Sequence, residues 1–241
     1  LFTFTVGPNV NCGDEITLTF QLRDGAENLG AVSINLKTGA PRIALRENFD
    51  AAAAPELPAG WTTSATGGQQ SWKTVANRNQ SRPNSVFSPA PFQAGVNELV
   101  SPAFSILTPN AEISFRNWYD LETTFLRNRL YDGSVLEIKI GAGGGEWRDI
   151  ETAGGAFLAG GYDGLLDDCC QNPLAGRRAW SGRSGVNQTS EFITSRVKLP
   201  SAAAGQTVRL RWRVGTDVGT FREGQYLDDV LVADGAACSC Q

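Results

Sequence analysis

The chain has 241 residues, of which 41% are hydrophobic, enough for one large or two small domains with a real core. Its formal charge of −4 gives no electrostatic basis for binding nucleic acid or an anionic membrane, and no apolar run approaches the roughly 20 residues that span a bilayer. Histidine is absent, which removes the commonest general base, the partner of a catalytic serine or cysteine, and the main nitrogen ligand of zinc.

The first segment, residues 1–42, predicts β-strands at 1–6, 15–24 and 30–39, where apolar and polar residues alternate. Two interpretations stay open: the tail of an immunoglobulin-like domain, or extra strands on the sheet that follows. The chain does not begin with Met, and its first residues lack the basic flank of a signal peptide. We therefore expect a piece of a longer polypeptide, whose neighbouring domains are its partners.

The second segment, residues 43–241, predicts one continuous succession of strands. Turns rich in Gly, Pro, Asn or Asp separate these strands at intervals of roughly 10 to 20 residues, which is typical of an antiparallel sandwich. The predicted fold is therefore all-β, an antiparallel jelly-roll β-sandwich of the concanavalin or galactose-binding kind. The expected strands lie at 42–50, 71–75, 98–106, 111–122, 133–141, 146–151, 191–199, 207–216 and 225–234.

Residues 153–185 form a long irregular stretch within this succession, and long loops in compact domains are often functional. The stretch carries Tyr162 and Trp180, and Trp147 follows a glycine-rich turn shortly before it. Aromatic rings at a rim suit stacking against sugar rings, so these three residues are the candidate ligand-binding residues. The alternative is that Trp180 packs under its own loop as a core residue.

The five cysteines do not have the spacing of a zinc site, because the "CC" and "CSC" pairs place the thiols too close together for a CxxC motif. Disulfides of a secreted protein are the better interpretation. Their connectivity stays open, and it includes a bridge between the adjacent Cys169 and Cys170. The full set is Cys12, Cys169, Cys170, Cys238 and Cys240.

Four motifs in order carry a resemblance to a known family: "ENFD" with "LPAGWT" and "SW", "YDGSVLEIKIGAGGGEWRDI", "AWSGRSG", and "LPSAAAGQTVRLRWRVGTD" with "GQYLDDVLV". Together they resemble MAM-like jelly-roll domains of bacterial secreted proteins, such as those appended to immune inhibitor A-type peptidases and the cleaved adhesin domains of gingipain-type peptidases. The resemblance runs from about residue 45 to 234 and leaves out the first forty residues and the "CC" insertion. It implies a secreted or cell-surface accessory module that contacts glycans or extracellular proteins.

Two adjacent carboxylates, Asp228 and Asp229, interrupt an apolar strand near the end of the chain. A buried carboxylate without a partner is destabilising by several kcal/mol, so it requires a cation or hydrogen bonds. The first and last strands of a jelly roll commonly lie side by side, which would bring Glu47 and Asp50 close to this pair. Carboxylates that converge in this way favour Ca²⁺, so these four residues are the predicted ligands of a structural calcium ion.

An alternative without a metal stays open for the same pair. In it Asp228 caps a turn, and Asp229 pairs with an arginine, either Arg46 or Arg213.

A second acidic set, formed by Asp120, Glu122 and Asp132, could also hold calcium. Because Arg127 and Arg129 lie beside it in the sequence, we expect a loop held by ion pairs instead.

A catalytic role is not expected. Adjacent carboxylates on a strand point apart, so Asp228 and Asp229 cannot form the pair that a glycosidase needs. A hydrolase would require an unrecognised pair that includes Glu137 or Glu151, and nothing in the sequence brings these two together. The sequence therefore predicts a non-catalytic accessory or adhesion module stabilised by calcium. A carbohydrate-binding module and a hydrolase are the two alternatives.

Overall fold

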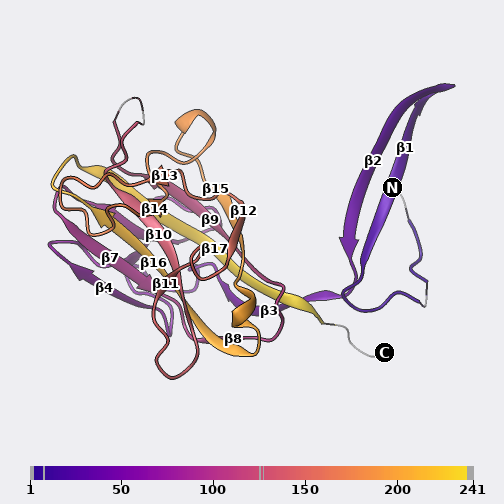
Figure 1. Cartoon of the computed structure of the whole chain (residues 1–241), viewed down its shortest axis with the longest axis horizontal. Coiled ribbons are helices and arrows are strands. Elements are labelled where there is room, and N and C mark those ends of the chain that lie inside the picture. Colours follow the sequence, from indigo (N-terminus) through magenta and orange to yellow (C-terminus); the bar gives the residue numbers. More distant parts are fainter. Residues whose placement is uncertain (1–2, 8, 125, 127, 238–241) are drawn as a thin grey trace. The chain divides into compact units, whose positions relative to one another are not determined.

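The computed structural model (Figure 1) describes residues 3–7, 9–124, 126 and 128–237. The chain divides into two units, one made of Leu1–Arg42 with Asp234–Gln241 and the other of Ile43–Ala233. Within the described residues the regular structure consists of strands and two short 3₁₀ turns, Val186–Gln188 and Ser201–Ala203. The all-β prediction is thus confirmed. No helix in this part of the chain is long and apolar enough to cross a membrane.

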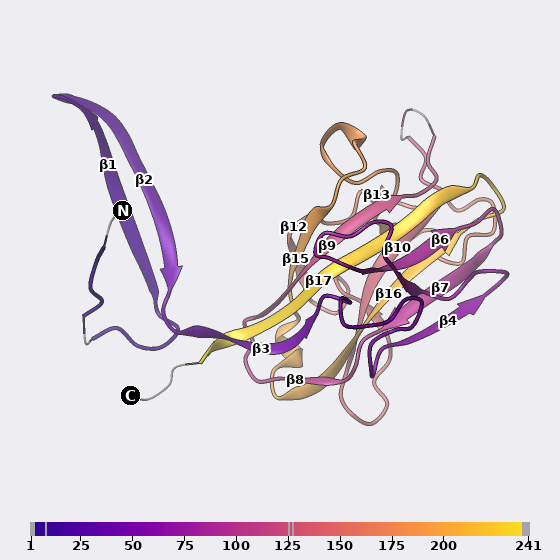
Figure 2. The same cartoon turned by 180° about the vertical axis from the view of Figure 1, so that it is seen from behind.

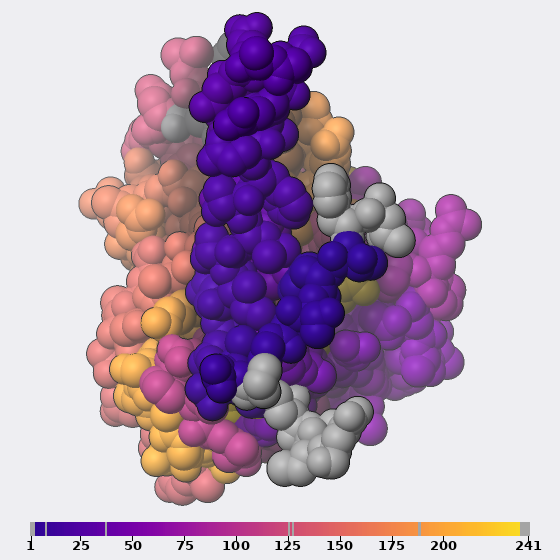
Figure 3. Space-filling model, turned by 90° about the vertical axis from the view of Figure 1, so that its right-hand side faces the viewer, coloured from indigo at the N-terminus to yellow at the C-terminus, as the bar shows by residue number. Residues whose placement is uncertain are grey.

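The first unit is built around one antiparallel hairpin, β1 (Glu15–Asp24) with β2 (Glu27–Lys37), drawn in indigo in Figure 3. Among the described residues these two strands pair only with each other. The strand expected at 1–6 is wrong for residues 3–6, which form no ladder. Alternation alone does not make a strand, because each strand needs a hydrogen-bonding partner.

The second unit holds two large β-sheets and a small two-stranded sheet of β13 (Gly164–Leu165) and β14 (Arg178–Ala179). The smaller of the two large sheets is a six-stranded sheet in which β16 is central, pairing with β10, β7 and β8. Across this sheet the order is β11 (Arg148–Asp149), β10 (Gly133–Ile140), β16 (Gln206–Thr216), β7 (Gly95–Val100) and β4 (Thr62–Thr66), with β8 (Phe104–Ile106) also on β16.

The larger sheet has seven strands, and the last strand of the chain lies in its middle. The first strand of the unit, β3, pairs with this last strand, β17, as Figure 2 shows from behind. The expectation that the first and last strands of the fold lie side by side is therefore met. The order is β12 (Ala156–Ala159), β15 (Ile193–Lys198), β9 (Ala111–Asp120), β17 (Arg222–Ala237), β6 (Ser85–Ala90) and β5 (Lys73–Val75), with β3 (Ala40–Glu47) also on β17.

The core lies between these two sheets and is dominated by aromatic rings. Trp212 of β16 meets Phe115 of β9 edge to face, with ring centroids 5.5 Å apart. Trp61 also stacks on Trp212, with ring centroids 6.0 Å apart. Alternation in the sequence explains this layering, because Leu210 and Trp212 point inward and are fully buried, while Arg211 between them faces outward.

Five strands were missed by the sequence patterns: β4, β6, β12, β13 (Gly164–Leu165) and β14 (Arg178–Ala179). Four of them have only two to five residues, which is too short to show a clear periodicity. β6 contains Pro89, which cannot donate to a ladder. Its partner β17 has a bulge between Arg222 and Gln225, and a Cβ on Gly224 would stand 2.0 Å from the Ser88 carbonyl oxygen. The bulge and the glycine together accommodate the proline.

Candidate functional site

Asp228 is a fully buried carboxylate on β17. Its Oδ2 accepts hydrogen bonds from the backbone N–H groups of Gln80 at 2.7 Å and Ser81 at 3.0 Å. Its Oδ1 accepts the N–H of Asp229 at 2.8 Å. Burial raises the pKa of Asp228 to about 6, although these N–H groups favour the charged form. The carboxylate thus caps the turn at residues 80–81, as the alternative without a metal predicted.

The hydroxyl of Ser81 lies between the carboxylates of Asp50 and Asp228. Ser81 Oγ is 3.3 Å from Asp50 Oδ2 and 3.3 Å from Asp228 Oδ1. A hydroxyl has one hydrogen to donate, so it can satisfy only one of these two carboxylate oxygens at a time. Asp50 Oδ1 also accepts the N–H of Asn84 at 3.0 Å. We call Asp50, Ser81 and Asp228 the Ser81 link; it joins the segment after β3, the β5–β6 loop and strand β17.

Glu47 and Asp229, the other two predicted calcium ligands, do not belong to this link. Glu47 Oε1 accepts the N–H of Phe49 at 2.7 Å. Asp229 follows Asp228 on β17 and has a positive φ of 49°. In the described part of the chain, no three of the four predicted carboxylates bring their oxygens within 4.8 Å of one another. The predicted pairing of Asp229 with Arg213 is also wrong, because Arg213 pairs with Glu98 and Glu137.

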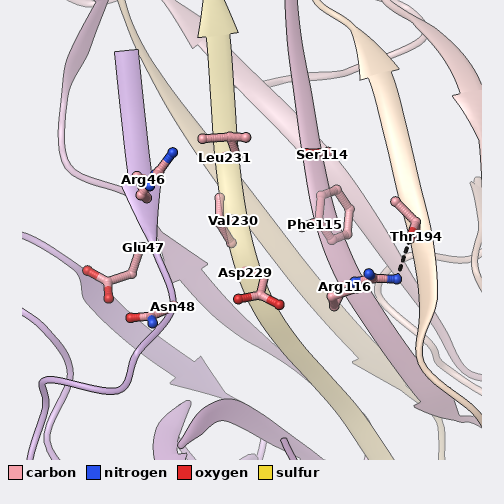
Figure 4. A pocket seen from close by; sticks show the side chains of 10 residues that line it. All are labelled: Arg46, Glu47, Asn48, Ser114, Phe115, Arg116, Thr194, Asp229, Val230 and Leu231. Atoms are coloured by element: carbon pink, nitrogen blue, oxygen red, sulfur yellow. Dashed lines mark hydrogen bonds between the residues drawn. The ribbon is translucent and has the colours of Figure 1, made fainter. Parts of the chain in front are cut away.

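Asp229 instead lines an open groove of about 570 Å³ on the outer face of the seven-stranded sheet, shown in Figure 4. In this view Asp229 of β17 lies between Glu47 on one side and Arg116 of β9 on the other. Arg116 Nη1 donates to Thr194 Oγ1 on β15 at 2.6 Å, which fixes the guanidinium against the sheet. We call this the sheet-face groove; its lining residues are Arg46, Glu47, Asn48, Ser114, Phe115, Arg116, Thr194, Asp229, Val230 and Leu231.

The candidate aromatic residues do not form a ligand-binding rim. Trp180 is fully buried and Tyr162 is 8% exposed, and their ring centroids lie 4.9 Å apart in the core. The prediction that they bind a ligand is therefore replaced by the alternative in which Trp180 packs under its loop. Trp147 is half-buried, and the guanidinium of Arg211 lies 4.4 Å from its ring centroid. One face of that ring is already covered.

Glu137, the candidate for a hydrolase, is held by arginines on the outer face of the six-stranded sheet. It accepts from Arg177 Nη1 at 2.5 Å, Arg211 Nε at 2.7 Å and Arg213 Nη1 at 3.3 Å. Burial opposes ionisation, but these arginines outweigh it and lower the pKa of Glu137. A general acid needs a raised pKa, so this carboxyl is unsuited to that role. The other candidate, Glu151, pairs with Arg178 at 3.1 Å.

A second group of acidic residues does assemble, but with a member that the sequence did not suggest. Oxygen atoms of Glu122, Asp132 and Asp217 all lie within 4.8 Å of one another, and we call this group the tri-carboxylate cluster. Burial, above all, raises the pKa of Asp132 to about 8, and burial also raises the pKa of Asp217. Asp120 is not a member, because it pairs with Arg183 at 3.3 Å.

The expected ion pair between this acidic set and Arg129 is not formed, because Arg129 pairs with Asp167 at 2.6 Å. Arg127 lies outside the described residues, so its pairing stays a prediction. Cys169 and Cys170 form a disulfide with each other, and a carboxylate oxygen of Asp217 lies within 4.8 Å of their sulfur atoms. The vicinal bridge, one of the open connectivities, thus borders the tri-carboxylate cluster. Cys238 and Cys240 lie outside the described residues.

No protein-family model matches the chain, and no curated protein sequence matches it. Among solved structures the chain is similar to the K3 cleaved adhesin domain of Lys-gingipain from Porphyromonas gingivalis, with 16% identity and a TM-score of 0.47 over 80% of this chain and 100% of that chain. It is similar to the K1 domain of the same protein at 14% identity and a TM-score of 0.44, over 80% of this chain and 99% of that one.

The chain is also similar to the CBM22-1 xylan-binding domain from Paenibacillus barcinonensis Xyn10C, with 12% identity and a TM-score of 0.42 over 83% of this chain and 99% of that chain. Two of these three structures are adhesin domains of gingipain, the group that the sequence motifs resemble. Each similarity is distant in sequence and partial in structure.

Proposed function

We propose that this chain is a non-catalytic accessory or adhesion module of a secreted or surface protein, stabilised by Ca²⁺ at the Ser81 link. The ordered motifs of the sequence support the module class and its extracellular setting. The observation that carries the calcium proposal is that Ser81 Oγ stands between Asp50 and Asp228, 3.3 Å from an oxygen of each.

The donor atoms at the Ser81 link fit a hard cation. Two carboxylate oxygens and a hydroxyl oxygen lie together, and calcium prefers six to eight oxygen ligands. Neutral donors also reach both oxygens, Asn48 Nδ2 on Asp50 Oδ2 at 2.6 Å and the N–H of Asp229 on Asp228 Oδ1 at 2.8 Å, and a cation would add the positive charge that these donors lack. Because the three residues come from separate segments of the chain, a bound ion would hold the segment after β3 and the β5–β6 loop against β17.

The first test measures Ca²⁺ binding by calorimetry with the metal alone as ligand. Asp50→Asn should lower the number of Ca²⁺ ions bound per chain by one, because the amide keeps the size of the side chain and removes its negative charge. Glu112→Gln is the matched control, since Glu112 pairs with Arg196 on an exposed surface and should leave the stoichiometry unchanged. Unaltered Ca²⁺ binding in Asp50→Asn would rule out calcium at the Ser81 link.

The sheet-face groove favours a second function, the binding of a glycan. Its carboxylates and guanidiniums offer acceptors and donors for sugar hydroxyls, and the groove replaces the 153–185 loop as the proposed site. Asparagine tolerates the positive φ of position 229, so Asp229→Asn should keep the backbone. Hydrogen bonds to charged groups contribute about 1.5 to 3 kcal/mol, so glycan affinity should fall roughly 10-fold or more.

A glycan array probed with the wild type, Asp229→Asn and Trp147→Ala makes the comparison. The Trp147 variant lies away from the groove and should bind like the wild type. Binding that survives Asp229→Asn and disappears in Trp147→Ala would place the glycan elsewhere.

A further inference from the structure

The tri-carboxylate cluster sits at one end of the paired strands β10 and β16, where three chain segments meet. Asp132 immediately precedes β10 and Asp217 immediately follows β16, and the two strands pair antiparallel through Gly133 and Gly215. Glu122 follows β9 of the other sheet. Backbone donors hold two of the carboxylates: Asp132 Oδ1 accepts the N–H of Asp217 at 2.9 Å, and Glu122 Oε2 accepts the N–H of Thr220 at 2.7 Å.

One oxygen of the cluster is buried without a partner. Asp217 is 4% exposed, and its Oδ1 accepts no hydrogen bond. Among the residues that the structure describes, no arginine or lysine pairs with Glu122, Asp132 or Asp217. A buried carboxylate oxygen beside two further carboxylates is strongly unfavourable unless positive charge is supplied. The neighbouring Asp120 and Asp167, by contrast, each have an arginine partner.

The backbone of Gly219 lies close to two of these side chains. A Cβ placed on Gly219 would stand 2.4 Å from Glu122 Oε2 and 2.5 Å from Asp217 Oδ1. Glycine therefore lets both oxygens approach the backbone at one point, and any larger residue would push them apart.

We propose that Glu122, Asp132 and Asp217 form a second cation site, which binds a hard divalent ion of the Ca²⁺ type. The donors are carboxylate oxygens, which favour calcium over softer metals. The sulfur atoms of Cys169 and Cys170 are joined in a disulfide and so offer no thiolate for zinc. The bound ion ties together the segments that follow β9, precede β10 and follow β16.

Calorimetric titration with Ca²⁺ alone tests this site in the full chain carrying Asp50→Asn, in which the Ser81 link is disabled. One Ca²⁺ per chain should still bind. Adding Asp217→Asn should remove it, and adding Gly219→Ala should weaken it at least tenfold while leaving all three carboxylates in place. Ca²⁺ bound as tightly by the Asp217→Asn chain as by its parent would overturn the site.

Thermal unfolding separates loss of the ion from loss of the fold. In the presence of a chelator the melting temperature of the Asp217→Asn chain should equal or exceed that of its parent, because the amide removes one of three clustered negative charges. When Ca²⁺ is added at roughly 100 times the Kd, the melting temperature of the parent should rise by about 5 to 10 °C, and that of the variant should not change. A lower melting temperature of the variant than of its parent in chelator would contradict the proposal. So would an equal rise of both melting temperatures on addition of Ca²⁺. Failure at the Ser81 link alone leaves the Asp50→Asn chain binding one ion, so the two sites are tested independently.

Discussion

Replacing Trp180 with alanine should lower the free energy of unfolding by about 4 kcal/mol and the melting temperature by roughly 8 to 16 °C. The ring is fully buried and meets Phe115, Phe157 and Tyr162 with centroids 5.8, 5.5 and 4.9 Å away. Its Nε1 also donates to the Gly160 carbonyl at 2.8 Å, so truncation leaves a cavity and removes one of the two hydrogen bonds that this carbonyl accepts, the other coming from Ser195 Oγ. Chemical denaturation monitored by circular dichroism measures the change.

Trp147→Ala is the control for this experiment, because that ring is half-buried and packs on Arg211 at the surface. Its loss should lower the free energy of unfolding by less than about 1 kcal/mol. If Trp180→Ala instead unfolds like the wild type, the assignment of Trp180 to the core is wrong. The comparison also shows why loss of ligand binding in a Trp180 variant would not identify a binding residue.

The second large effect is expected for Glu137→Gln, which should lower the free energy of unfolding by about 3 kcal/mol at pH 7. The side chain is 4% exposed and accepts from Arg177, Arg211 and Arg213. An amide there leaves three partly buried guanidiniums with less negative charge among them. Glu112→Gln is again the control, since its exposed pair with Arg196 should contribute no more than about 0.5 kcal/mol.

The effect of Glu137 should depend on pH in a defined direction. Because the arginines lower the folded-state pKa of Glu137 below its ordinary 4.5, the ionised group stabilises the fold above that pH. This contribution is lost as the pH falls below 4.5 and through the folded-state pKa. Denaturation curves from pH 7 to pH 3 should therefore show the wild type and Glu137→Gln converging at the acidic end. A difference that stays constant with pH would mean that the charge of Glu137 is not the stabilising feature.

The sequence predicted the central strands and their neighbours, but it did not predict the position of a loop residue. The central strands were predictable because their side chains alternate between core and solvent, as Leu210, Arg211 and Trp212 do on β16. The proximity of Asp50 and Asp228 was also predictable, because the first and last strands of the sandwich are neighbours. Ser81, which links them, was not, because its position depends on the conformation of a loop.

The tri-carboxylate cluster shows the same limit. Glu122 and Asp132 are near each other in the sequence, but Asp217 joins them only through the pairing of β10 with β16. The one available signal was an aspartate directly after a long strand of alternating apolar and charged residues, in "RWRVGTDVG", where a polar side chain stands at the end of a strand. That signal identifies a candidate donor and gives no indication of its partners.

The sequence by itself determined that this protein is all-β and lacks histidine chemistry, because strand periodicity and composition are local properties that can be counted along the chain. Only the tertiary structure decided that Glu137 is neutralised by arginines while Asp217 keeps a buried oxygen without a partner. In the sequence Glu137 lies within a predicted strand and Asp217 comes directly after one. The energy of a charge depends on burial and on distances to other charges, and these distances are set by strand pairing between segments far apart in the chain.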